Sequence, residues 1–216
     1  MRRLAHLHHR DNKTNEPVWH VQLAIVAVIA LQLILDSSLT IGSKYYIAII
    51  ELLLLLALMA VAYTAVSLIV RRSLAIVLTA LVSASNILSL GLVIFSLFDG
   101  HDIDGRNLLI SALAIYLTNI IIFGLWYWEM EFKRGKKPQD FLFPQENAPE
   151  HAGLHNVGWR PTFADYLYVS ATNATAFSPT DTLPLTHRAK TLMVIQSLAS
   201  IIIVVLVTAR AVNIII

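Results

Sequence analysis

The sequence predicts an all-α integral membrane protein, with five transmembrane helices and a re-entrant half-helix before the last span. Of the 216 residues, 56% are hydrophobic and only 14% are charged, whereas a soluble domain carries about 25% charged residues. Several apolar runs reach roughly 18 residues or more, which is the length that crosses a bilayer. The half-helix is predicted because a polar, proline-interrupted segment over 162–188 leads directly into the last apolar run.

The composition excludes several classes of site. The chain has no cysteine, so disulfides, thiolate metal sites and cysteine nucleophiles are excluded. Its net charge of +2 is too small to indicate nucleic-acid binding. The sequence contains no paired-carboxylate, serine-triad or phosphate-loop motif, so neither an enzymatic activity nor a cofactor is predicted.

Histidines form two groups outside the apolar runs, and we interpret neither as a metal site. The first belongs to a basic, solvated tail over residues 1–18. The second has the i, i+4 spacing of metal ligands on a helix, but no further ligand cluster accompanies it. The two groups are His6, His8 and His9 in the tail, and His151 and His155 beside Glu150.

Four apolar runs before residue 129 are predicted to be transmembrane helices, and their boundaries carry recognisable residues. Tyr45 and Tyr46 open the second run, and an aromatic group closes the fourth, as expected at a membrane interface. The predicted spans cover 19–35, 45–70, 74–98 and 107–128, so that 19–98 forms a three-helix membrane region, with Arg71 and Arg72 between its second and third helices.

The distribution of Lys and Arg predicts the orientation of the chain. Eleven of these residues flank the spans on one side, whereas only Lys44 and Arg106 lie on the other. Because cytoplasmic loops are enriched in positive charge, the N-terminus and the proline-rich loop over 129–161 are predicted to be cytosolic, with the spans in the cell inner (plasma) membrane. The eleven are Arg2, Arg3, Arg10, Lys13, Arg71, Arg72, Lys133, Arg134, Lys136, Lys137 and Arg160.

The segment over 162–188 is predicted to enter the membrane and return to the same side. It begins TFADYLYVSATNATAF, and Pro179 and Pro184 then interrupt any helix. A lipid-facing crossing is unfavourable for its acidic, amide and hydroxyl side chains. We therefore expect a short helix over 165–175, a return before Arg188, and a last helix over 189–216.

Residues 170–188, followed by AKTLMVIQSLASIIIVVLVTARAV, resemble the pore segment and inner helix of simple bacterial potassium channels. Residues 163–181 also resemble the C-terminal block of a bacterial family of uncharacterised multi-pass membrane proteins. The resemblance implies a channel-like module over 107–216, with an outer helix at 107–128, a pore hairpin and an inner helix. It also implies a homo-oligomer, with a tetramer favoured.

The filter of those channels is degenerate here. Ala176, Phe177 and Ser178 stand where Gly-Tyr-Gly would lie, and no glycine occurs between Trp159 and Ile216. Because a potassium filter needs backbone angles that favour glycine, potassium selectivity is not expected. What remains is a polar, filter-like vestibule of Thr172, Asn173, Thr175, Ala176, Phe177, Ser178, Thr180 and Asp181.

Several polar positions have two interpretations. Four copies of Asp181 would form a ring that favours cations, or each copy would cap a turn. Glu51 lies inside the second predicted span, where an ionised carboxylate is costly unless it is paired or wet. Gln196 and Ser200 are candidates to line the inner helix of a pore, whereas Asn119 is expected to make an interhelical hydrogen bond.

Two functions are therefore predicted from different classes. The first is an ion-channel-like protein that passes cations or small solutes without a potassium filter. The alternative is a non-conducting scaffold or sensor with a channel-like fold. With the orientation that the charge distribution predicts, the hairpin enters the membrane from the cytosolic side, as in the pores of ionotropic glutamate receptors. The pore loop of potassium channels enters from the outside.

Overall fold

The computed structural model describes seven segments of the chain, namely 19–40, 44–62, 68–98, 104–132, 139–147, 159–175 and 181–215. Within them the chain is almost entirely helical. The elements, in order, are α1 (Trp19–Ile34), the 3-10 turn η2 (Ser37–Leu39), α2 (Lys44–Ala62), α3 (Leu68–Phe98), α4 (Gly105–Phe132), β1 (Phe141–Leu142), α5 (Pro144–Asn147), α6 (Phe163–Ala174), β2 (Leu183–Pro184) and α7 (His187–Ile215).

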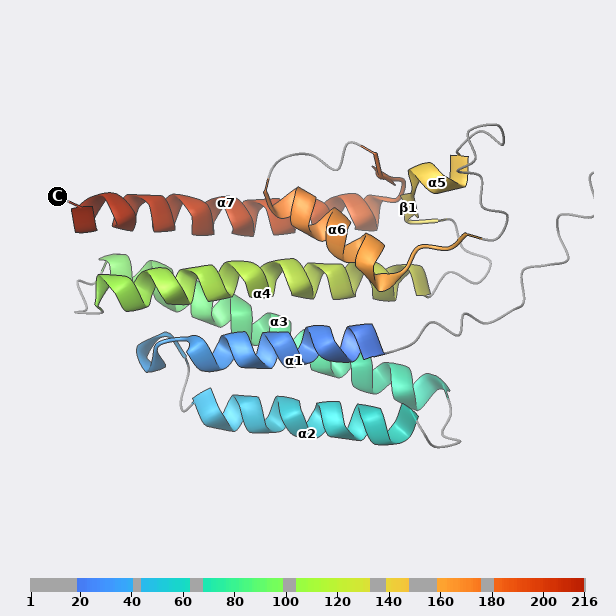
Figure 1. Cartoon of the computed structure of the whole chain (residues 1–216), viewed down its shortest axis with the longest axis horizontal. Coiled ribbons are helices and arrows are strands. Elements are labelled where there is room, and N and C mark those ends of the chain that lie inside the picture. Colours follow the sequence, from blue (N-terminus) through green and yellow to red (C-terminus); the bar gives the residue numbers. More distant parts are fainter. Residues whose placement is uncertain are drawn as a thin grey trace, which may run out of the picture.

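Five long helices lie side by side with alternating direction, and α4 is at their centre (Figure 1). Helix α4 packs against α1, α3, α6 and α7. In its most apolar 18-residue stretch 56% of the residues are buried, against 22% in the corresponding stretches of α3 and α7. The core therefore surrounds α4, while α3 and α7 present more of their apolar surface outward.

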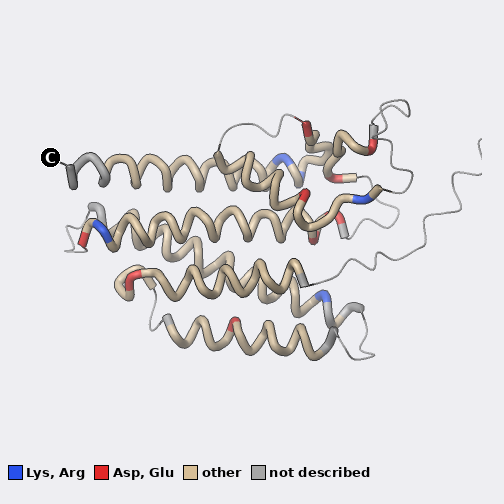
Figure 2. Tube along the Cα trace, viewed as in Figure 1, with Lys and Arg blue, Asp and Glu red and all other residues tan. Residues whose placement is uncertain are grey.

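In the part of the chain that the structure describes, three helices are long and apolar enough to cross a membrane, namely α3, α4 and α7. The apolar parts of α1 and α2 are shorter. The prediction of an all-α chain with helices able to span a membrane is confirmed for the described residues, apart from one short antiparallel pairing of β1 with β2. Charged residues lie mainly at the two ends of the helical bundle (Figure 2).

The predicted boundary between the second and third spans is wrong. Helix α2 ends at Ala62, and α3 already begins at Leu68, so that Arg71 and Arg72 lie inside α3 rather than in a loop. Hydropathy does not mark this boundary, because the apolar run continues through 63–70 without a Gly, Pro or charged residue. Arg72 instead donates from Nε to Glu129 of α4 at 2.8 Å, which ties the start of α3 to the end of α4.

An aromatic cluster fixes the chain at the end of the bundle where α4 finishes. The ring of Phe141 lies 5.1 Å from that of Tyr127, and the ring of Phe143 lies 5.3 Å from that of Tyr166 and 5.7 Å from that of Trp159. Phe141 and Phe143 are buried. Burial of large aromatic rings in such tilted and edge-on pairs is stabilising, so the segment after α4 is held firmly against α4 and α6.

Candidate functional site

Helix α6 is a short helix with a defined start. The Asp165 carboxylate accepts hydrogen bonds from the backbone N–H of Thr162, at 2.7 Å, and from its hydroxyl, at 2.8 Å. An acidic side chain at this position satisfies donors at a helix N-terminus. The helix has 12 residues and is therefore ~18 Å long, which is well short of the ~30 Å hydrocarbon core of a bilayer.

The residues just before α6 and the strand β2 lie at the same end of the bundle (Figure 1). Trp159, just before α6, packs on Phe143. After α6 the chain comes back to the same place, because the Leu185 N–H donates to the Asp140 carbonyl at 2.8 Å and β2 pairs with β1. Helix α6 thus runs partway along α4, and the described chain over 183–186 lies at the end of the bundle where α6 starts and α7 begins.

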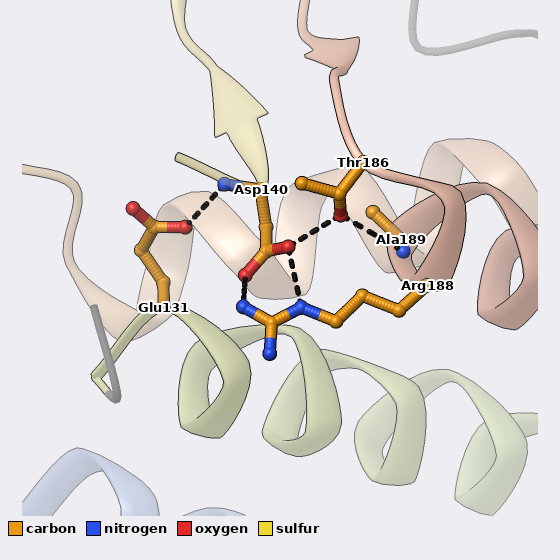
Figure 3. A network of polar contacts seen from close by, with 5 residues as sticks. All are labelled: Glu131, Asp140, Thr186, Arg188 and Ala189. Atoms are coloured by element: carbon orange, nitrogen blue, oxygen red, sulfur yellow. Dashed lines mark hydrogen bonds and ion pairs between the residues drawn. The ribbon is translucent and has the colours of Figure 1, made fainter. Parts of the chain in front are cut away.

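The returning chain is anchored by a buried carboxylate, that of Asp140, which is 1% exposed (Figure 3). It accepts from Arg188 Nε at 2.7 Å and also from Arg188 Nη2 and the Thr186 hydroxyl. The Asp140 backbone N–H donates to Glu131 at the end of α4, at 3.0 Å. Thr186 Oγ1 in turn accepts from the Ala189 N–H at the start of α7. Asp140 therefore joins the end of α4, through its backbone N–H, to the start of α7, through its carboxylate.

A buried polar network centred on Gln196 joins α6 to α7 and α4. Gln196 Nε2 donates to the carbonyl of Ser170, at 2.9 Å, and to its hydroxyl, at 2.7 Å. Gln196 Oε1 accepts from the Tyr127 hydroxyl at 2.6 Å and from Asn173 Nδ2 at 2.9 Å. Asn173 Nδ2 also donates to the Met193 carbonyl. All donors and acceptors of the Gln196 amide are therefore used within one chain.

Further polar contacts lie along α4 on the N-terminal side of Tyr127. The Ser170 hydroxyl donates to the Ile120 carbonyl at 2.6 Å, and Asn119 Nδ2 donates to the Ser200 hydroxyl at 3.0 Å. Ser170 and Ser200 have no exposed surface. The interhelical hydrogen bond predicted for Asn119 is confirmed. These buried bonds fix the position of α6 relative to its two long neighbours, because separating the helices would leave polar groups without partners.

Close backbone approach reinforces the contact between α4 and α6. A Cβ atom added at Gly124 would lie 3.2 Å from Cα of Leu167, whereas one added at Gly91 of α3 would meet nothing within 4 Å. Gly124 thus allows the two helices to lie closer than another residue would, as small residues do in membrane helix packing.

The structure brings only part of the predicted vestibule together. The hydroxyls of Thr172 and Thr175 donate to carbonyls of their own helix, and Asp181 is exposed. Asn173 belongs to the buried network. The remaining predicted positions lie outside the described residues; they are Ala176, Phe177, Ser178 and Thr180.

The two residues expected to line the inner helix occupy a different environment. Gln196 and Ser200 are fully buried against α4 and α6, which is not where residues lining a pore between copies would lie. The spacing of Gln196 and Ser200 correctly places both side chains on one face of the last helix. It does not show which neighbouring helices cover that face. Glu51, the predicted intramembrane acid, lies on α2 and is also fully buried.

Sequence reasoning missed Asp140 and Tyr127 as members of the site. Asp140 lies in the loop after α4, and only the threonine and arginine around the start of the last helix hint at an acidic partner. The described residues contain no group of three or more His, Cys, Asp or Glu side chains that could hold a metal ion.

Comparison with family models, curated proteins and solved structures gives no match for this chain.

Proposed function

We propose that α4, α6 and α7 form the pore-type module of a channel-like membrane protein that passes cations or small solutes without potassium selectivity. The observation that carries this proposal is the hairpin between two long apolar helices: α6 is too short to cross a bilayer, and the chain returns to the end it came from. Non-helical backbone at membrane depth is tolerated only where it is buried in protein or lines water.

The proposal includes five spans, formed by α1, α2, α3, α4 and α7. Their alternating direction supports it, because α1, α3 and α7 begin at the end of the bundle where α2 and α4 finish (Figure 1). The excess of Lys and Arg assigns that end to the cytosol. The hairpin then enters from the cytosolic side of the plasma membrane.

Conduction would require several copies, with a tetramer favoured. In the described part of one chain, a crevice between α3, α4 and α7 is too tight for water and is lined by apolar side chains alone. A pathway would therefore form between copies, next to the exposed apolar face of α7 and the return segment that carries Asp181. The crevice is lined by Leu90, Val93, Ala112, Ile115, Ile203 and Leu206.

A non-conducting scaffold or sensor is the second candidate, and one observation favours it. The polar groups of Gln196 are all bonded to Ser170, Tyr127 and Asn173, so this part of the hairpin has no free polar group to offer a passing solute. In that case the hydrogen-bond network of Gln196 keeps the hairpin rigid, and the hairpin presents a fixed surface to a partner in the membrane.

Ion flux into liposomes distinguishes the two candidates. For a pore, purified protein is expected to carry cations faster than anions, and Asp181→Asn is expected to lower this preference severalfold, because it removes one negative charge per copy from an exposed position on the hairpin. Asp104→Asn is the matched control, since Asp104 is exposed at the opposite end. Flux no greater than that of protein-free liposomes would contradict the pore and leave the scaffold.

Cysteine accessibility tests the re-entrant path separately. The chain has no cysteine, so single cysteines can be introduced at the exposed positions Ala164, Leu185 and Thr208. We expect a membrane-impermeant maleimide to label Ala164→Cys and Leu185→Cys from one face and Thr208→Cys from the other. Labelling of positions 164 and 185 from opposite faces would show that the segment crosses the membrane.

A further inference from the structure

A second buried polar site lies away from the hairpin, on α2. Glu51 lies on the same face of α2 as Ala48, Leu55 and Leu58, at helical spacing, and all four residues are buried. Glu51 has no exposed surface at all. The other three residues belong to an apolar core shared with α1 and α3, so a carboxyl group interrupts an otherwise hydrophobic interface.

The polar atoms at this site are left without partners. Both carboxyl oxygens of Glu51 and the amide nitrogen of Gln32 are buried and make no hydrogen bond with the described residues. Gln32 lies on α1 and is the side chain within reach of Glu51. Two facing polar groups, each unsatisfied, are costly in an apolar interior, and they indicate a ligand that the protein atoms do not supply.

We propose that Glu51 is a proton-binding site, in which the neutral carboxyl group pairs with the amide of Gln32. A protonated carboxyl offers one donor and one acceptor, and a primary amide offers the same. The O–H of Glu51 then donates to Gln32 Oε1, and Gln32 Nε2 donates to the carbonyl oxygen of Glu51. A single bound proton thus satisfies both side chains through a cyclic pair.

A proton suits this site better than a metal ion or an ion pair. A metal ion would need several oxygen or nitrogen ligands, and Glu51 belongs to no group of His, Cys, Asp or Glu in the described chain. No ion pair of Glu51 occurs among the described side chains. An ionised carboxylate would therefore stand in an apolar interior at a cost of several kcal/mol.

Few other titratable groups face this interface. On α1 the described group is His20, roughly 18 Å from Gln32 along the helix, and on α3 it is Arg72, which is bonded to Glu129. Asp36, just after α1, accepts from Ser38. On α2 itself the described titratable side chains are Tyr45 and Tyr46, six and five residues before Glu51, and both are exposed. Proton binding at Glu51 is therefore governed mainly by its own burial and by Gln32.

Ionisation of Glu51 would couple to the packing of α1 against α2. The carboxylate gains hydration only if water reaches the interface, which requires the two helices to separate. The neutral form keeps the interface closed, and loss of the proton loosens it. As the pH rises, we expect the wild-type protein to lose stability, whereas Glu51→Gln, which mimics the neutral group, retains it.

Infrared spectroscopy on the full-length protein in lipid tests the proposal directly. We expect a C=O stretching band of a protonated carboxyl at neutral pH, absent from Glu51→Gln and retained in the control Asp104→Asn. In Gln32→Met the band should move to higher frequency, because the C=O group of Glu51 loses a hydrogen-bond donor. This readout follows the carboxyl itself and is independent of whether the protein conducts.

Either of two results would overturn proton binding at Glu51, and a third would overturn its coupling to the packing of α1 against α2. One is a neutral-pH spectrum of the wild-type protein without a protonated carboxyl band that Glu51→Gln removes, which would mean that Glu51 is ionised. The other is failure of Glu51→Gln to fold while Glu51→Asp folds, since a neutral mimic should be tolerated if the native group is neutral. If stability falls equally in wild type and in Glu51→Gln as the pH rises, ionisation of Glu51 is not coupled to the packing of α1 against α2.

Discussion

Replacing Arg188 with methionine is expected to lower the free energy of unfolding by about 3 kcal/mol, the lower end of the range for breaking a buried ion pair. The Asp140 side chain is 1% exposed, whereas that of Arg188 is 41% exposed. Without the guanidinium, a carboxylate stays buried with only the Thr186 hydroxyl and no opposite charge. Equilibrium unfolding of the purified protein in mild detergent measures the loss.

The opposite single substitution, Asp140→Asn, is the matched control. It leaves the charge of Arg188 able to reach water, so we expect a smaller loss, of about 1–2 kcal/mol. The double variant Asp140→Asn/Arg188→Met is expected to be more stable than the sum of the single losses predicts, since it no longer buries an unpaired charge. Equal losses in the two single variants would contradict this asymmetry and indicate that Asp140 is hydrated.

The local features of the hairpin were accessible from the sequence. The short helix expected over 165–175 is present as α6, Phe163–Ala174, because Thr162 and Asp165 are capping residues whose effect depends on near neighbours in the chain. The long apolar helices were likewise predictable from run length. Their boundary near Ala62 was not, because the sequence over 63–67 contains only apolar and hydroxyl-bearing residues and leaves the hydropathy unchanged.

The partners of the polar side chains were not predictable, since they are distant in the chain. Asp140 and Arg188 are 48 residues apart, and Tyr127 and Gln196 are 69 apart. A single sequence shows that Gln196 is polar on an apolar helix, which fits both a water-lined surface and a buried amide. Only the packing of α6 between α4 and α7 decides that the amide is enclosed.

Replacing Gln196 with methionine is expected to release α6 from α7 and to lower the free energy of unfolding by about 3 kcal/mol. Methionine has a similar length, so the change removes hydrogen bonds and leaves little cavity. The Tyr127 hydroxyl loses its partner and Ser170 loses two contacts. Each buried polar group left without a hydrogen-bond partner costs about 1–3 kcal/mol. Asn173 keeps its bond to the Met193 carbonyl, which limits the total.

Labelling of a buried position on α6 separates this effect from general destabilisation. Val169 has no exposed surface, so Val169→Cys should react slowly with a maleimide in the otherwise cysteine-free chain and much faster once Gln196→Met is added. Leu198→Met is the matched control, because Leu198 lies on the same helix but is 58% exposed. It should change neither stability nor labelling. If Gln196→Met and Leu198→Met behave alike, the network does not hold α6, and the hairpin is positioned by Gly124 and the aromatic cluster instead.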